Sequence, residues 1–514
     1  MWQGESSTRP HNSWQSPGSR DFGILVVLGL ANILVHTLAN GQYGFYRDEL
    51  ATLDNARHLA WGYVEYPPLT AFTGRVELAL FGTSLTGFRF FPAVAQGVVL
   101  VLAGLAAREL GGERPAQLAA AVAASIAPLS LFSGSFLSYS SFDYLWWVLA
   151  AYLVIRLLKS DDMRWWVAIG AAIGVGMLTK YTMSFLVSGV VGGVLLTPAR
   201  RYLKSPWLWC GAAVAVLVML PNMVWQIQHH FVSYEFLKSI HARDVQWGRA
   251  NHFLPAQFWK CANVATVPLW CAGLWYLFAV PGGKRYRLLG WMYVIPLLVY
   301  FVAKGRDYYL APAYPVLLAA GAVWGEQWAR SLSTRSALTV RRTTWGVLAV
   351  AGVGAAAVTL PVAPLNSTWW RVAEGINGNF NYQIGWPDLV ETVAKIREAL
   401  PVQEQARLGI LARDDGEAGA VNFYGPAYGL PRAISGMNSN WQRGYGDPPP
   451  ETVIAVGWDR DFLNRHFESC ELAGRLTNRY GIENSAIDGY ADVFVCRHLR
   501  QPWPEFWEHF RYYG

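Results

Sequence analysis

The sequence predicts a polytopic α-helical membrane protein that ends in a small α/β domain. Of its 514 residues, 53% are hydrophobic and 15% are charged, whereas soluble proteins carry about 25% charged residues. The chain also has 25 Trp and 25 Tyr, residue types that favour the membrane–water boundary. Apolar runs recur up to residue 363, and strand-like and helix-like segments alternate after it. This composition excludes a disordered chain.

Eleven apolar runs approach the roughly 20 residues that a helix needs to cross a bilayer. They are 22–40, 90–108, 116–132, 142–158, 165–179, 182–197, 207–224, 261–280, 288–303, 309–329 and 344–363. The stretch 69–82 is short and contains Arg75 and Glu77, so it is expected to lie in the membrane interface. Residues 1–21 are polar and are expected to form a disordered cytoplasmic tail.

The basic residues predict how the spans are oriented. Lys and Arg gather in every second loop, which fits an N-terminus on the cytoplasmic side. The clusters lie at 9–20, 108–114, 156–164, 200–204, 284–287 and 330–342. They punctuate apolar runs and form no continuous stripe, so no nucleic-acid partner is expected despite the net charge of +7. Eleven spans from a cytoplasmic N-terminus place the C-terminal part on the extracytoplasmic side. The expected location is the cell membrane, which is the inner membrane in a cell that has two membranes.

The predicted domains are a membrane domain over 22–363 and an extracytoplasmic α/β domain over 364–514. Three short apolar segments of the second domain predict buried strands, at 407–411, 452–456 and 492–495. Helices are expected over 387–400 and 459–468. Alternating strands and helices of this length are typical of a small α/β domain.

The first outer loop, residues 41–69, is too long for a plain connector. It holds four acidic residues together with Arg47, Arg57 and His58. Residues 46–60 are expected to form an amphipathic helix in which Asp48, Thr52 and Asn55 share one face. Two interpretations remain open for it, a solvated helix that rests on the bilayer and a part of a functional site.

This loop resembles the membrane glycosyltransferases of family 39. The resemblance rests on Asp48-Glu49 after the first span, an aromatic segment and the turn Tyr66-Pro67-Pro68-Leu69. The segments 178–181 and 304–315 agree with it, and it covers residues 22–330. The family includes protein O-mannosyltransferases and aminoarabinose transferases of lipid A, all of the GT-C fold. Many relatives carry a charged residue where this chain has Tyr66, a difference that bears on the acceptor.

The resemblance implies transfer of a sugar from a polyprenyl-phosphate donor to a hydroxyl of a protein, lipid or glycan outside the membrane. It implies that Asp48 is the general base, because the attacking hydroxyl must lose a proton. Glu49 would orient the helix or the acceptor, and Asp143 is a second acidic candidate. A helix N-cap beside Ser141 is the alternative for Asp143. The acceptor side of the loop would comprise Arg47, His58, Glu65 and Tyr66.

A phosphate leaving group needs cations or hydrogen-bond donors around it. The candidates on the outer side are Lys180, Lys304 and Arg306, with Tyr308 and Tyr309 beside them. These charges depart from the pattern of basic inner loops. Contacts with lipid headgroups are the alternative for each of them.

No cofactor is expected. Four histidines lie in or beside the outer loop 225–260, at positions 229, 230, 241 and 252, without the spacing of a metal site. A divalent metal ion is the alternative, and no sequence motif supports it. A polytopic lipid or solute transporter is the alternative function, and it would place ionisable residues mid-span. A non-catalytic assembly protein is a third hypothesis.

Cys470 and Cys496 are predicted to form a disulfide. They are the only cysteines after Cys271, and the predicted outside location favours oxidation. The alternative is two buried free thiols.

Overall fold

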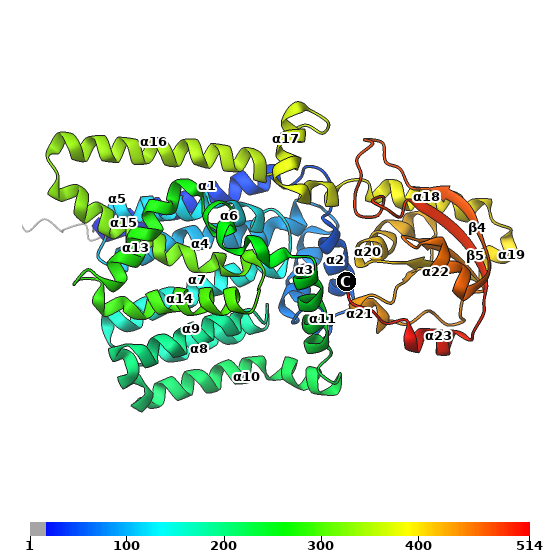
Figure 1. The fold of residues 1–514 in the computed structure, drawn as a ribbon, viewed down its shortest axis with the longest axis horizontal. Helices are drawn as coiled ribbons and strands as arrows, with labels where there is room; N and C mark the ends of the chain where they lie inside the picture. The colour runs from blue at the N-terminus through cyan, green and yellow to red at the C-terminus, as the bar shows by residue number, and fades with distance from the viewer. Residues whose placement is uncertain (1–16) are drawn as a thin grey trace, which may run out of the picture.

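The computed structural model describes residues 17–514, and it places a helical body and an α/β domain end to end (Figure 1). Most of the predicted tail, residues 1–16, lies outside the described part. The last residues of that predicted tail are helical, because the first helix begins at Pro17.

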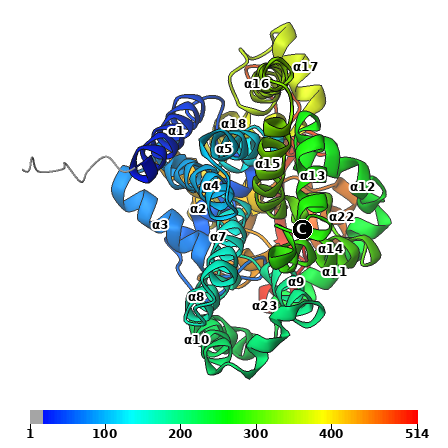
Figure 2. The ribbon, with the colours of Figure 1, turned by 90° about the vertical axis from the view of Figure 1, so that its left-hand side faces the viewer.

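Seventeen labelled helices form the helical body and the segment that leads out of it. They are α1 Pro17–Ala39, α2 Arg47–Arg57, α3 Leu69–Phe81, α4 Phe90–Glu109, α5 Arg114–Ser125, α6 Pro128–Ser133, α7 Tyr139–Ser160, α8 Trp165–Met177, α9 Met183–Leu196, α10 Pro206–Gln228, α11 Val232–Gln246, α12 Phe253–Ala256, α13 Val267–Phe278, α14 Arg287–Val302, α15 Tyr314–Ser331, α16 Thr334–Thr359 and α17 Thr368–Ile376. Viewed from the end of the body, α4, α7 and α15 lie inside the bundle, with α16 and α10 near opposite margins (Figure 2).

The predicted count of eleven spans is not confirmed. Within residues 17–514, four helices are long and apolar enough to cross a membrane, namely α1, α4, α7 and α10. Two bent pairs raise this number to six if each pair is one span. Other apolar runs are broken by the backbone. The run 116–132, for example, is divided into α5 and α6 before Pro128, where a continuous helix would lose a hydrogen bond.

Small residues allow the helices of the body to approach each other closely. Gly170 of α8 faces Gly211 of α10, and a Cβ atom on Gly170 would collide with the carbonyl oxygen of Gly211. Such contacts are common where helices pack within a membrane. On their outward-facing surfaces, α1 and α10 leave Leu30 and Leu217 exposed, as expected of surfaces that face lipid tails.

The α/β domain is built on one five-stranded sheet with the strand order β2-β1-β3-β5-β4. The strands are β1 Leu408–Ala412, β2 Ala433–Ile434, β3 Thr452–Val456, β4 Phe467–Arg475 and β5 Asp492–Leu499. Strands β2, β1 and β3 are parallel, and β5 and β4 are antiparallel to their neighbours. The three predicted strands correspond to β1, β3 and β5. Strand β4 was missed because its exposed edge carries the polar residues Glu468 and Glu471 in place of an apolar run.

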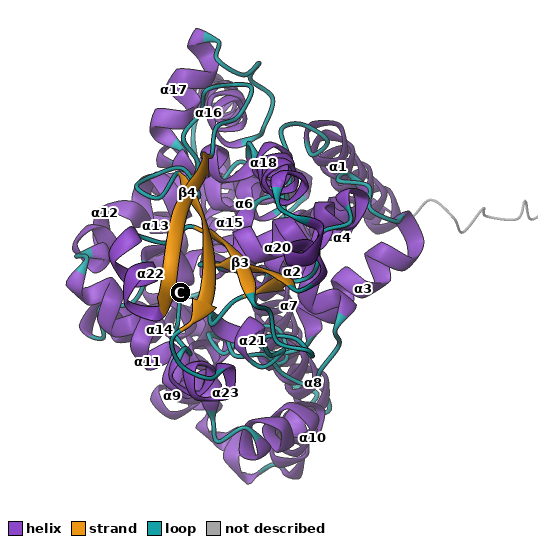
Figure 3. Cartoon of the chain, turned by 90° about the vertical axis from the view of Figure 1, so that its right-hand side faces the viewer, coloured by secondary structure: helices purple, strands orange, loops and turns teal. Residues whose placement is uncertain are grey.

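Helices cover both faces of this sheet (Figure 3). The helices of this domain are α18 Trp386–Ala399, α19 Val402–Ala406, α20 Asp415–Tyr424, α21 Asn438–Trp441, α22 Arg460–His466 and α23 Trp503–His509. Alternate residues of β3 point to opposite faces, so Ile454 packs with α18 and α20 while Val453 packs with α22 and α23. The core on the α20 face continues into the helical body through Leu50 and Leu53 of α2.

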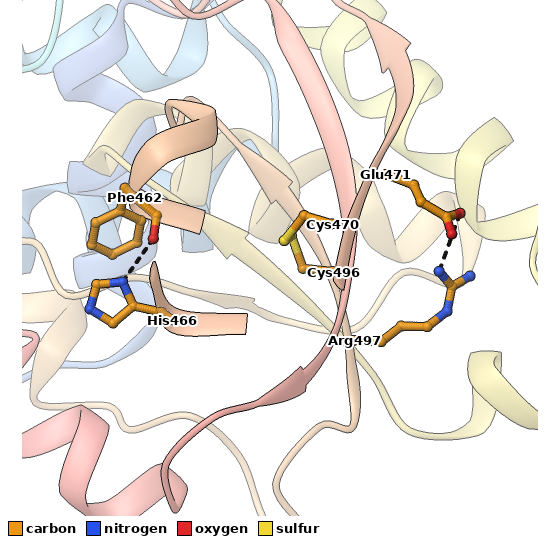
Figure 4. Close-up of a disulfide and its surroundings, with 6 residues drawn as sticks. All are labelled: Phe462, His466, Cys470, Glu471, Cys496 and Arg497. Atoms are coloured by element: carbon orange, nitrogen blue, oxygen red, sulfur yellow. Dashed lines mark hydrogen bonds and ion pairs between the residues drawn. A yellow bond between two sulfur atoms is a disulfide. The ribbon is translucent and has the colours of Figure 1, made fainter. Parts of the chain in front are cut away.

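A disulfide joins Cys470 of β4 to Cys496 of β5 (Figure 4). The two residues are direct partners in the antiparallel ladder. The disulfide therefore ties the edge strand β4 to its neighbour β5.

Candidate active site

A cavity of about 430 Å³ lies where the helical body meets the α/β domain. The helical body contributes the start of α2, the segment 65–67, the start of α7, the loop 180–182, α11, Arg306 and Tyr309. The α/β domain contributes the start of α20, together with Met437, Asn438, Ser485, Tyr490 and Gly514. Both domains therefore form one site.

Helix α2 presents Asp48 to this cavity. The helix begins after Tyr46, whose backbone N–H donates to Oε2 of Glu49 at 2.8 Å. This contact closes one half of a capping box. The Asp48 side chain is 45% exposed, and its Oδ1 lies 3.1 Å from Nε of Arg47. It is thus accessible to a bound molecule, with a cation beside it.

Apart from Asp48 at its start, the polar side of α2 is buried, and Asp54 and Asn55 bond to the α/β domain. Thr52, Asp54 and Asn55 are all buried, and Gly419 of α20 leaves room for the backbone of Leu50. The interpretation of residues 46–60 as a solvated helix on the bilayer is therefore wrong, because their polar face meets protein.

Glu49 does not reach the cavity. Its carboxylate pairs with Arg89 at 2.6 Å, and both side chains are fully buried. Oε1 of Glu49 also accepts a hydrogen bond from the backbone N–H of Leu137 at 2.8 Å. Glu49 thus holds α2 against the helices behind it.

Lys180 lies among three tyrosine rings at the edge of the cavity. Its Nζ lies 4.8 Å from the ring centre of Tyr139, 5.0 Å from that of Tyr308 and 4.4 Å from that of Tyr309. It also donates to Oγ of Ser140 at 3.2 Å. Burial lowers the pKa of this ammonium group. No carboxylate of the described residues forms an ion pair with Lys180, which leaves its charge for an anion.

Arg306 lines the cavity together with Arg243 and Arg249. The sequence did not predict this cluster of arginines. Asp244 of α11 accepts from Nε of Arg306 at 2.5 Å and lies 3.2 Å from Arg249. The order Arg243-Asp244, Trp247, Arg249 within one outer loop is the signal in the sequence that could have indicated this cluster.

Lys304 and Asp143 are not on the cavity wall. Lys304 is exposed and is not among the lining residues. Asp143 is buried inside α7, and its Oδ2 accepts from the hydroxyl of Thr182 at 3.1 Å. The N-cap of α7 is Ser138, so the capping interpretation of Asp143 is wrong. The hydrogen bond of Asp143 to the cavity wall is the one from Thr182.

The remaining predicted loop residues divide in the same way. Glu65 and Tyr66 line the cavity, as Arg47 does. His58 is outside it, with Nδ1 2.8 Å from the carbonyl oxygen of Asp54. Tyr308 is not part of the wall, but its ring faces Lys180.

The α/β domain adds a polar wall that the sequence did not predict. Arg413, Asp414 and Asp415 line the cavity. The guanidinium of Arg413 stacks over Tyr490 at 3.8 Å. Burial raises the pKa of Asp415 well above its usual value, although Nδ2 of Asn440 donates to it at 2.8 Å. Only the tertiary fold brings these residues to the loop 41–69.

No group of three or more His, Cys, Asp or Glu side chains that could hold a metal ion occurs within residues 17–514.

The fold matches a solved structure over almost the whole chain. The crystal structure of ArnT from Cupriavidus metallidurans bound to undecaprenyl phosphate superimposes with a TM-score of 0.59. The alignment covers 92% of this chain and 98% of that one, at 15% sequence identity. The chain has the fold of ArnT. It is thus a mostly helical membrane-protein fold with several apolar spans and a C-terminal mixed α/β sheet.

Sequence comparisons agree with the ArnT-like fold. Residues 65–225 match the family model described as dolichyl-phosphate-mannose-protein mannosyltransferase. The lipid A galacturonosyltransferase RgtD of Rhizobium johnstonii is 27% identical over 285 residues, which are 52% of this chain and 57% of that protein. An undecaprenyl phosphate-alpha-4-amino-4-deoxy-L-arabinose arabinosyl transferase of Pseudomonas fluorescens is 28% identical over 285 residues, which are 50% of this chain and 48% of the relative.

The matched segments thus span about half the length of these curated relatives. Together the comparisons confirm the predicted resemblance to the GT-C membrane glycosyltransferases of family 39.

Proposed function

We propose that this protein transfers a sugar from a polyprenyl-phosphate donor to a hydroxyl acceptor, with Asp48 as the general base. The observation that carries the proposal is the cavity itself. A solvent-accessible carboxylate, Asp48, and a buried ammonium group that forms no ion pair within the described residues, Lys180, line the same cavity. The ArnT-like fold and the relatives with polyprenyl-phosphate chemistry support the donor class.

In this proposal the donor phosphate binds at the side of the cavity that the helical body forms. Lys180 and Arg306 neutralise the charge that develops on the phosphate as the glycosidic bond breaks. The rings of Tyr308 and Tyr309 keep the Lys180 ammonium in place by cation–π contacts. Lys304 takes no part, since it is exposed outside the cavity.

Asp48 accepts the proton of the attacking hydroxyl group. A carboxylate suits this role because it is ionised at neutral pH and can be protonated transiently as the new bond forms. Arg47 lies beside Asp48, with its Nε 3.1 Å from Oδ1 of the carboxylate. Asp143 does not line the cavity, but it accepts a hydrogen bond from Thr182 and so orients this hydroxyl on the cavity wall.

The acceptor enters between α2 and the α/β domain, where Glu65, Tyr66 and Arg413 line the wall. We propose a lipid acceptor, because RgtD is a lipid A galacturonosyltransferase and because α11 adds the apolar side chains Leu237 and Ile240 to the same wall. The reaction takes place outside the cytoplasmic membrane, in the orientation expected from the basic loops.

The test is donor consumption by purified protein. The protein is incubated with undecaprenyl phosphate linked to aminoarabinose, galacturonic acid or mannose, with and without lipid A. Formation of free undecaprenyl phosphate together with glycosylated lipid A supports the proposal. No consumption of any of these donors, while an ArnT control is active, contradicts it.

A further inference from the structure

The α/β domain holds the cavity-lining residues of the first outer loop through two buried polar contacts. The first is made by Arg443, two residues after the end of α21. Its guanidinium donates to the carboxylate of Asp54 and to the side-chain oxygen of Asn55, both on α2. The Arg443 side chain is 11% exposed and that of Asp54 is 4% exposed. This ion pair is thus largely desolvated.

Asn55 links Arg443 to two residues of the cavity wall. Its Nδ2 donates to Oε1 of Glu65 and to the hydroxyl of Tyr66, each at 2.7 Å. A guanidinium can only donate and a carboxylate can only accept. Arg443 therefore demands the oxygen of the amide and Glu65 demands its nitrogen, so the two charged groups together select one orientation of the Asn55 amide.

Ser439 of α21 holds the same glutamate from the other side. Its hydroxyl donates to Oε2 of Glu65 at 2.6 Å and accepts from the backbone N–H of Val64 at 2.9 Å. Both oxygens of Glu65 are thus occupied, one by α2 through Asn55 and one by the α/β domain. Glu65 cannot rotate without losing one of these hydrogen bonds.

We propose that Arg443 and Ser439 are positioning residues, through which the α/β domain sets Glu65 and Tyr66 in place in the wall of the cavity that Asp48 also lines. The proposal rests on the function proposed above. It makes the α/β domain a working part of the active site, because displacement of catalytic groups by about 1 Å can lower rates about 100-fold. Arg443 and Ser439 need not touch the substrate.

The test uses the full-length protein with Arg443→Met, Ser439→Ala and Ser439→Thr, which restores a hydroxyl. The matched control is Arg511→Met, since Arg511 forms another ion pair between the domains, with Glu235 of α11, and both partners are more than a third exposed. We expect Ser439→Ala and Arg443→Met to lower kcat roughly 10- to 100-fold. Binding of undecaprenyl phosphate should stay within about twofold, and Ser439→Thr should recover most of kcat.

A double-mutant cycle separates positioning from simple fastening of the domains. If Ser439 acts through Glu65, Ser439→Ala should add little to the loss in a Glu65→Gln background. Additive losses, or kcat values for correctly folded Arg443→Met and Ser439→Ala that equal those of Arg511→Met, would overturn the proposal.

Amide hydrogen exchange tests the same contacts without any turnover. Residues 58–69 should exchange faster in Arg443→Met and Ser439→Ala than in Arg511→Met. Equal exchange in all three variants overturns the proposal even if the protein is an active transferase. If no donor is consumed by the unmodified protein, the proposed function fails, and the exchange result still decides whether the α/β domain holds this segment.

Discussion

Glu49 and Arg89 form an ion pair in which neither side chain reaches solvent. Arg89 also donates to the backbone carbonyl oxygens of Asn40 at 2.9 Å and Gly44 at 2.7 Å. The pair therefore ties the end of α1, the start of α2 and the start of α4 together. Asp48, the neighbour of Glu49 in the chain, owes its place at the cavity to this buried anchor.

Glu49→Gln is expected to destabilise the protein, because it leaves the charge of Arg89 buried without its partner. Breaking a buried pair in this way costs roughly 3–5 kcal/mol. Thermal unfolding in detergent should show the loss, with Glu391→Gln as the control, since the Glu391–Lys395 pair is exposed and worth little. A Glu49→Gln protein that melts like the unmodified protein would contradict this anchoring role.

Asp48→Asn is expected to abolish transfer while the protein still folds and binds donor. The change keeps the size of the side chain and removes the base, which contributes about 100-fold or more to the rate. Single-turnover transfer and binding of undecaprenyl phosphate should be measured side by side. Near-normal transfer by Asp48→Asn would assign the base to another residue.

Lys180→Ala and Arg306→Ala are expected to weaken binding of undecaprenyl phosphate, whereas Lys304→Ala should not. Each charge-assisted hydrogen bond is worth roughly 1.5–3 kcal/mol, or about 10- to 100-fold in affinity. Lys304 is the matched control because it is a nearby cation outside the cavity. Equal losses in all three variants would indicate a general effect of charge at the membrane surface.

The contribution of Lys180 should also depend on pH. Only the protonated ammonium attracts phosphate, and burial lowers its pKa. Donor affinity should therefore fall as the pH rises, and it should do so below the pH at which exposed lysines deprotonate. The pH dependence should be absent in Lys180→Ala. A persistent dependence there would assign it to another group.

Removal of the disulfide, by Cys470→Ser with Cys496→Ser, is expected to lower the stability of the α/β domain. Its two cysteines are 26 residues apart in the sequence, and closing a loop of this size contributes roughly 3 kcal/mol. Limited proteolysis should cut the double variant more quickly within 467–499. Mass spectrometry of the unmodified protein without reduction is the direct check. Two freely alkylated thiols would exclude the bond.

Several features of this protein could be predicted from the sequence because they depend on local patterns. Long apolar runs require helices in a membrane, where no water can pair with the backbone. Short apolar segments such as 452–456 require buried strands. The resemblance to family 39 was carried by contiguous residues, Asp48-Glu49 and the turn at 66–69. None of these inferences needed to know which segments touch.

The composition of the cavity was decided by tertiary structure. Periodicity showed that Asp48, Thr52 and Asn55 share a face of one helix, but a pattern names no partner for that face. The partner is the α/β domain, more than 350 residues later in the chain. In the same way, the sequence does not distinguish Lys304 from Arg306. In the structure Arg306 forms an ion pair with Asp244 of α11 and lines the cavity, whereas Lys304 does not line it. Contacts of this kind depend on how distant segments pack in space, and local spacing carries no information about them.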